Sequence, residues 1–302
     1  MISSSIRHVS QRRHIELRMV CTIALSVAAA TIAVPLAYAQ QPHGESPDSS
    51  HTSTTVVTDP RAAQPERPTI ATHAYTVAPG YVEIETGVQE MRPTNTSQFA
   101  APIAVKFGVT PRLQLEIQGG YTHNTASSTS PANAGATDIA VALKQRLLDA
   151  APLIQDLSLQ GSIKFATGAH NVSTGTTDLS ILLISSRQIG AAELDLNAGY
   201  THRSGDGSTV PLDATLLTAS LGAPIFGAVG GVAELFSYPG TSGPTDTPPA
   251  VGFLTGPTLQ LKPWLVLDVG VILNVQHMQA NTVYAGVTYN IGRIPGLPTT
   301  HR

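Results

Sequence analysis

Residues 112–123 alternate strictly between apolar and polar side chains. Leu115 and Ile117 fall on one face of this segment, whereas Gln114 and Glu116 fall on the other. A repeat of two belongs to a β-strand with one apolar and one polar side. The same pattern recurs about every fifteen to twenty residues to the end of the chain, so it constrains the fold more than any other feature.

Twelve segments carry the alternation, and each has about the 9–11 residues with which a tilted strand crosses a bilayer. They predict a single antiparallel transmembrane β-barrel of about 12 strands, with an apolar outside and a polar inside. The segments are 81–91, 98–108, 112–123, 137–147, 156–166, 177–187, 193–203, 211–221, 225–238, 250–261, 264–275 and 282–291.

Charge placement gives a second test of the barrel. A Lys or Arg on the lipid face at mid-bilayer costs about 2–4 kcal/mol, so charges are expected on the inner face. In the clearest segments they do lie opposite the aliphatic side chains. Glu90 and Arg187 depart from this pattern, but both lie at segment ends, where water and headgroups tolerate a charge.

The connections between the segments alternate between long and short. Barrels of bacterial outer membranes have short periplasmic turns and longer outer loops. With twelve strands, both termini are therefore expected on the periplasmic side. Residues 222–224, which include Pro224, are expected to form one of the short turns.

The main structural alternative is a soluble all-β sandwich or barrel. Such a protein packs large apolar side chains inside and places its charges outside. This chain contains one Trp and six Phe, and charged residues make up only 12% of it, which favours the membrane barrel. Its formal net charge is −3, so it lacks the excess of positive charge that is typical of nucleic-acid-binding proteins, and a nucleic-acid partner is not expected. Its histidines lack the paired spacing of a zinc site, and no metal or other cofactor is expected.

The remaining segments suggest export. Residues 1–39 combine an arginine-containing start, an apolar stretch and Ala37-Tyr38-Ala39, which predicts a cleaved signal peptide for Sec export. Residues 40–75 are rich in Ser, Thr and Pro and predict a disordered periplasmic lead-in. Residues 76–291 are assigned to the barrel and 292–302 to a C-terminal tail. The expected location is the outer membrane of a Gram-negative-type bacterium, with its lipid and the barrel-assembly machinery as partners.

The predicted lumen holds the candidate functional side chains. Rings of charged side chains bias which solutes pass a pore, but they can also form an internal ladder of ion pairs that braces the barrel. The sequence leaves both interpretations open. The lumen-lining candidates are Glu83, Glu85, Lys106, Glu116, Asp138, Lys144, Arg146, Lys164, Asp195, Glu234 and Asp268.

Two other functions remain as alternatives to passage of a small-molecule solute. His202 and Ser204 share one face at a strand end, an arrangement that could serve an outer-membrane lipid-modifying hydrolase. Such catalysis needs a third group to orient the histidine, and Asp206 is the nearest candidate. Because Asp206 sits in a Gly-rich loop, an interfacial histidine followed by a loop is the simpler interpretation, and no enzymatic activity is predicted. The second alternative is a structural or adhesive barrel without transport.

Several segments resemble, in the right order, the outer-membrane putative transporter family linked to the meta-pathway of phenol degradation. The resemblance covers about residues 75–291, although Ala166-Thr167-Gly168 departs from the family's Pro-Thr-Gly. It implies an outer-membrane barrel that transports small, hydrophobic or aromatic solutes. The matching segments are 79–87, 107–115, 141–148, 164–168, 197–200 and 233–235.

Overall fold

The computed structural model describes residues 59–93, 97–126, 132–152, 155–208, 210–239, 241–242 and 247–295. The chain divides into two compact units, Met1–Val57 and Thr58–Arg302. The first unit, which contains the predicted signal peptide, lies outside the described residues, as do residues 40–58 of the predicted lead-in and 296–302 of the tail.

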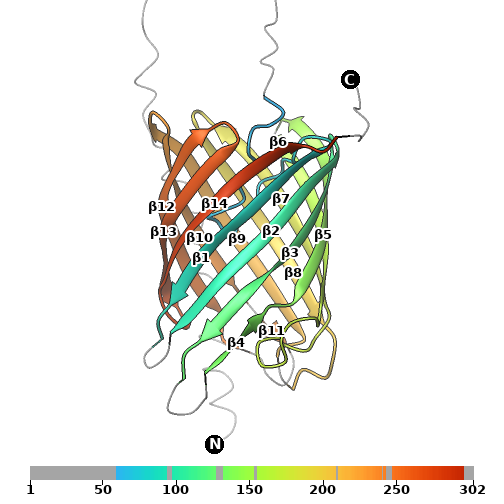
Figure 1. Ribbon diagram of the computed structural model, residues 1–302, viewed down its shortest axis with the longest axis vertical. Coiled ribbons are helices and arrows are strands. Elements are labelled where there is room, and N and C mark those ends of the chain that lie inside the picture. Colours follow the sequence, from blue (N-terminus) through green and yellow to red (C-terminus); the bar gives the residue numbers. More distant parts are fainter. Residues whose placement is uncertain are drawn as a thin grey trace, which may run out of the picture. The chain divides into compact units, whose positions relative to one another are not determined.

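Twelve long antiparallel strands form one closed barrel (Figure 1). Strand β14 pairs with β1, and β9 pairs with β10, so the sheet returns on itself. The strands are β1 (Tyr81–Met91), β2 (Gln98–Thr110), β3 (Leu113–Asn124), β5 (Ile139–Ala151), β6 (Gln155–Phe165), β7 (Asp178–Ile189), β8 (Ala192–Arg203), β9 (Asp213–Phe226), β10 (Val229–Tyr238), β12 (Ala250–Lys262), β13 (Leu265–Gln276) and β14 (Thr282–Arg293).

The predicted fold class is therefore confirmed, with one error in a turn. The connection expected at 222–224 lies instead at 227–228. Gly227 adopts a φ of 54°, a left-handed conformation that suits glycine, whereas Pro224 stays within β9 beside a shift in the β9–β10 register. Two short strands, β4 (Asn133–Ala136) and β11 (Thr241–Ser242), pair with β3 and β9, respectively. They lie at the end of the barrel that carries the longer connections, which we call the loop end; the opposite end, with the short turns, is the turn end.

The barrel is inside-out relative to a soluble protein. Leu183, Leu196 and Val269 are 45%, 46% and 51% exposed on the outer face, whereas Lys106 and Glu83 are fully buried inside. Tyr121, Tyr200 and Tyr238 are also exposed, near strand ends, where an aromatic girdle is expected. Within the described chain, no helix is long and apolar enough to cross a membrane.

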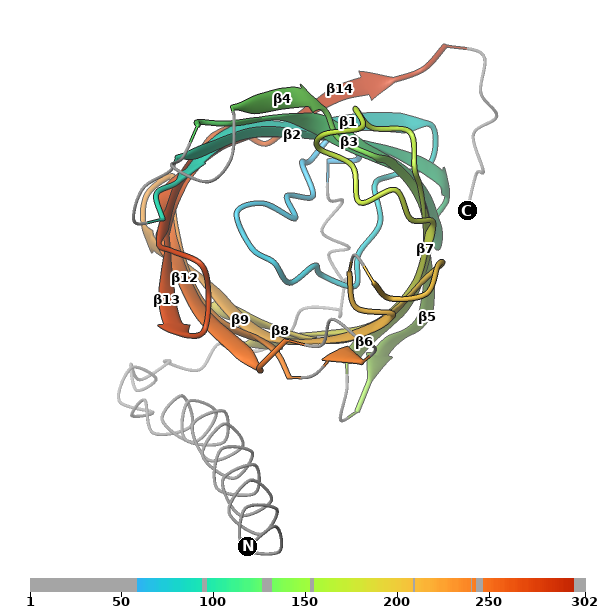
Figure 2. The ribbon, with the colours of Figure 1, turned by 90° about the horizontal axis from the view of Figure 1, so that it is seen from below.

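The segment before β1 differs from the sequence expectation. The composition of residues 59–75 predicts a disordered lead-in, but these residues lie inside the ring of strands, and the chain continues through residues 76–80 to β1 (Figure 2). Ala71, Ala74 and Val77 are at most 1% exposed. We call residues 61–78 the plug. It is ordered because its polar backbone meets hydrogen-bond partners on the barrel wall.

Candidate functional site

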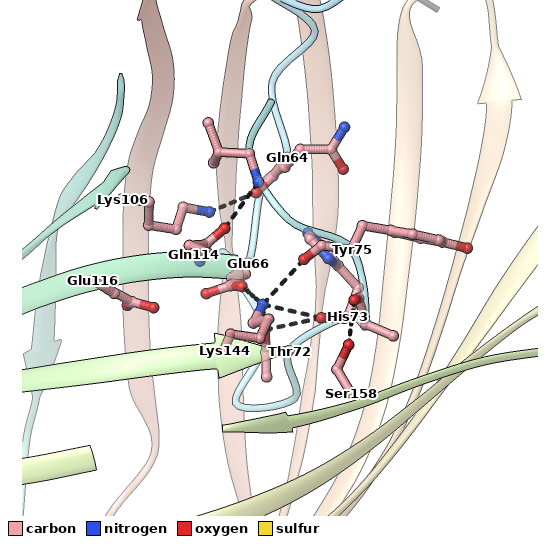
Figure 3. A network of polar contacts seen from close by, with 12 residues as sticks. Gln64, Glu66, Thr72, His73, Tyr75, Lys106, Gln114, Glu116, Lys144 and Ser158 are labelled. Carbon is pink, nitrogen blue, oxygen red and sulfur yellow. Dashed lines mark hydrogen bonds and ion pairs between the residues drawn. The ribbon is translucent and has the colours of Figure 1, made fainter. Parts of the chain in front are cut away.

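The inner wall and the plug share one buried network of charges (Figure 3). The Lys106 ammonium lies 2.7 Å from carboxylate oxygens of both Glu83, its cross-strand partner on β1, and Glu85, two residues further along the same strand. It also donates to the Gln64 carbonyl of the plug at 2.6 Å. A buried ammonium is tolerated only when its charge and its donors are satisfied, and here wall and plug do this together.

Lys144 on β5 makes the second charged contact with the plug. It forms an ion pair with Glu66 and donates to the Thr72 hydroxyl and the His73 carbonyl, both at 3.0 Å. Its side chain is 1% exposed. Lys144 therefore joins two parts of the plug, residue 66 and residues 72–73, to the same point on the wall.

Carboxylates of the wall accept hydrogen bonds from the plug backbone. Glu83 accepts the Gln64 NH and Glu85 accepts the Glu66 NH, each at 2.7 Å. The two oxygens of Glu234 on β10 accept the NH groups of residues 70 and 71 at 2.9 Å. Because a non-periodic segment cannot satisfy its own NH groups, these side chains replace the partners that a sheet would supply.

Uncharged side chains hold the second half of the plug in the same way. Asn197 on β8 both accepts from and donates to the backbone of Thr72, at 2.7 and 2.9 Å. The Ala74 NH donates to Ser186 at 2.8 Å, and the Ala74 carbonyl accepts from Ser158 at 2.5 Å. The plug therefore contacts strands on opposite sides of the barrel.

Arg67 occupies a notch made by two paired glycines. Gly87 on β1 lies opposite Gly286 on β14 in the strand register. A Cβ at Gly87 would lie 2.8 Å from Nη2 of the Arg67 guanidinium, and a Cβ at Gly286 would lie 2.7 Å from the same nitrogen. The guanidinium pairs with Asp268 on β13 at 3.4 Å. The absence of side chains at the two glycines is thus what lets Arg67 lie against the wall.

Apolar and aromatic contacts complete the docking of the plug. Ile70 packs against an inward-facing cluster that consists of Val232, Phe236, Leu254 and Tyr284. Near the turn between β12 and β13, the Arg61 guanidinium lies 4.4 Å from the centre of the Trp264 ring. The plug is thus attached at the turn end of the barrel as well as at its middle.

Cavities remain between the plug and the described part of the wall. The turn-side cavity, of about 490 Å³, lies between the plug and the small residues of β9 and β10, among them Gly222 and Gly230. The central cavity, of about 340 Å³, is bordered by Glu116 and Gln160. Arg67 and Thr69 line both cavities, so the plug between them acts as a partition.

His73 and Glu66 are ionisable side chains of the plug with strongly shifted pKa values. Burial and the nearby Lys144 charge lower the pKa of His73 to about 3, so the imidazole is neutral at physiological pH. Burial would raise the pKa of Glu66, but the charges of Lys106 and Lys144 outweigh it and hold this pKa below its usual range. The plug therefore contributes one neutral and one anionic group to the network.

The predicted lumen-lining residues fall into two groups. Glu83, Glu85, Lys106, Glu116, Lys144, Asp195, Glu234 and Asp268 face the plug or the cavities around it. The others lie nearer the barrel ends: Lys164 pairs with Asp138 and Asp178 at 3.0 and 3.2 Å, and Arg146 pairs with Asp149 and Asp156. The Arg146 guanidinium also contacts the plug, 5.6 Å from the centre of the Tyr75 ring. These peripheral residues form wall ion pairs of the bracing kind.

The His202 and Ser204 side chains, candidates for hydrolysis, are not joined in the structure. His202 contacts Asp213 on β9 at 2.8 Å, and the Ser204 hydroxyl accepts the Thr177 NH at 2.9 Å. Asp206, the expected orienting group, accepts the Ser208 NH at 2.9 Å. These contacts give the hydrolase alternative no support.

Sequence reasoning missed the plug, although one signal pointed to it. Around the middle of the barrel, the inner face carries more carboxylates than cations. The carboxylates are Glu83, Glu85, Glu116 and Glu234, and the cations are Lys106 and Lys144. Buried acceptors in excess require donors from elsewhere. Backbone NH groups of the plug supply several of them.

The structure resembles known barrels, whereas the sequence matches no family model and no curated protein. The crystal structure of the COG4313 outer membrane channel from Pseudomonas putida F1 superposes with a TM-score of 0.59 at 11% identity, over 72% of this chain and 98% of that one. The KdgM porin, in complex with disordered oligogalacturonate, gives 0.45 at 10% identity over 68% and 98%. The translocator domain of the autotransporter NalP from Neisseria meningitidis gives 0.41 at 12% identity over 69% and 86%. The first of these likenesses establishes an outer-membrane-type barrel fold.

Proposed function

We propose that this protein is an outer-membrane channel for small solutes, and that the plug narrows its lumen. The observation that carries the proposal is the turn-side cavity, which lies inside a barrel with a lipid-compatible outer surface. Solutes pass between the plug and the wall of β9 and β10, where glycine and alanine leave space. The family resemblance adds hydrophobic or aromatic solutes to the proposal. The proposal also includes Sec export to the outer membrane, with both termini periplasmic.

The plug makes this a narrow channel and not an open porin. Its backbone is held by side chains from β1, β3, β6, β7, β8 and β10, and Arg67 separates the two cavities. A solute that crosses the lumen must therefore move past Arg67 and Thr69. Passage requires at least a small displacement of residues 66–71 from the wall.

Filling the turn-side cavity tests this route. A Cβ at Gly222 would meet no atom within 4 Å, and its backbone is not left-handed, so Gly222→Leu is expected to fold and to occupy the path. Gly161 also has free space at its Cβ position but lies exposed on the outer face of β6, which makes Gly161→Leu a matched control. In planar bilayers, Gly222→Leu should reduce the single-channel conductance several-fold, while Gly161→Leu should leave it unchanged. Equal conductance in both variants would exclude this route, and a wild-type barrel without current would exclude the channel.

A further inference from the structure

Carboxylates outnumber cations on the surfaces of both cavities. Glu66, Glu85 and Glu116 line the central cavity, and Glu193 and Asp195 line the turn-side cavity. Among the described residues that line them there is one permanent cation, Arg67, which borders both. The space available to a solute is therefore more acidic than the wall as a whole.

The lysines of the lumen offset only part of this charge, because Lys106 pairs with Glu85 and Lys144 pairs with Glu66. Lys106 and Lys144 are 0% and 1% exposed, and their ammonium groups point into the contacts between wall and plug. Lys106 is surrounded by Glu83, Glu85 and the Gln64 carbonyl. The two lysines are thus already paired, while Glu116, Glu193 and Asp195 border the cavities without an ion-pair partner among the described residues.

An independent sign of a missing donor lies beside the central cavity. Glu116 is 3% exposed, and one of its oxygens accepts from Gln118 at 2.6 Å. Its other oxygen has no partner within the described chain, and neither has the side-chain oxygen of Gln160, which lines the same cavity. Buried acceptors without donors are costly, and an added ligand that carries N–H donors would satisfy them.

We propose that the lumen prefers cationic solutes, and that an ammonium or guanidinium group binds in the central cavity between Glu116 and Gln160. The inference rests on the proposed channel and specifies the charge of its solute, whether the rest of that solute is polar or apolar. Carboxylates in a low-dielectric cleft concentrate counter-ions and favour their passage. Because the carboxylates are spread over wall and plug, an organic cation with several donors suits them.

Binding and selectivity can be measured on the same full-length protein. Putrescine, a diammonium, is titrated calorimetrically into the barrel in detergent at pH 8, and succinate, a dianion of the same carbon chain length, is the paired probe. The potassium-to-chloride permeability ratio follows from the reversal potential under a potassium chloride gradient. Glu116→Gln keeps the shape of the side chain and removes its charge, and Asp206→Asn, in an exposed loop, is the control.

We expect putrescine to bind and succinate not to bind, with a permeability ratio above one. Glu116→Gln should weaken putrescine binding by about tenfold and lower the ratio, since a charge-assisted hydrogen bond is lost, whereas Asp206→Asn should change neither. A conducting channel that prefers chloride, or equal binding of both probes, would overturn the inference and leave the channel standing. Putrescine binding that depends on Glu116 in a barrel without current would instead overturn the proposed passage and keep the binding site.

Discussion

Asn197 and Thr72 form a reciprocal pair of hydrogen bonds between the wall and the plug. The Thr72 NH donates to the Asn197 side-chain oxygen at 2.7 Å, and the Asn197 amide donates to the Thr72 carbonyl at 2.9 Å. Both residues are buried. A side-chain amide on β8 therefore pairs with plug backbone as a neighbouring strand would.

Replacing this amide should loosen the plug while keeping the barrel. Asn197→Ala leaves a buried NH and a buried carbonyl of Thr72 without partners, at a cost of about 1–3 kcal/mol for each group. Hydrogen exchange of residues 61–78 should accelerate by at least tenfold, whereas exchange in strands far from β8 should not change. Asn124→Ala is the control, because Asn124 pairs with Asn133 at the loop end. Unchanged protection of the plug in Asn197→Ala would contradict its anchoring through Thr72.

Lys106 should be required for stability of the barrel and plug together. Lys106→Met leaves Glu83 and Glu85 as buried carboxylates without their cation, which costs about 3–5 kcal/mol. The midpoint of urea unfolding in lipid vesicles should fall clearly. Lys164→Met should shift it less, because Lys164 is 22% exposed at the loop end and solvent screens its ion pairs. Equal shifts in the two variants would contradict a larger contribution to stability from the ion pairs of Lys106 with Glu83 and Glu85.

Trp264, the only tryptophan of the chain, should report on docking of the plug. The Arg61 guanidinium lies over its ring, a contact that is worth about 0.5–1 kcal/mol at a partly exposed site. Arg61→Ala should increase quenching of the Trp264 fluorescence by acrylamide. Arg92→Ala, at an exposed position paired with Glu90, should leave the quenching at its wild-type value. Identical quenching in wild type and Arg61→Ala would place the start of the plug away from Trp264.

Docking of the plug should weaken as the pH falls from 7 to 5. His73 faces Lys144, Lys106 and Glu66, and its ring lies 5.4 Å from the Tyr75 ring at a tilt of 36°. It lines the same cavity as Glu193 and Asp195. Its pKa is about 3 when docked and about 6.5 in a free chain, so between these values the released state binds the extra proton. The docking free energy is therefore complete above pH 6.5 and falls by about 1.4 kcal/mol per pH unit below it.

Hydrogen exchange of the plug, corrected for its intrinsic pH dependence, measures this effect. Between pH 7 and 5 the Glu66 carboxylate stays largely ionised in both states, so Glu66 adds little to the expected slope. His73→Gln should flatten the profile. A wild-type profile already flat over this range would contradict a neutral, desolvated His73.

The sequence by itself determined the barrel: the number of long strands, most of their ends and the side that faces lipid. These features depend on local sequence, because the alternation within each strand indicates which face is apolar and which is polar. In β3, for example, Ile117 points outward and Glu116 points inward. The turn before β10 was misplaced because the sequence signal there was weak. Pro224 indicated a turn at 222–224, whereas the structure forms the turn at Gly227.

Only the tertiary structure decided what fills the lumen. The plug has no periodicity, and its order depends on partners that are distant in sequence, such as Asn197, 125 residues from Thr72, and Glu234, 163 residues from Ala71. Likewise, the alternation placed Glu83 and Lys106 on the inner face but could not show that the plug backbone would share them. Such contacts exist only once the barrel has closed, because closure brings side chains from opposite walls within hydrogen-bonding distance of one segment.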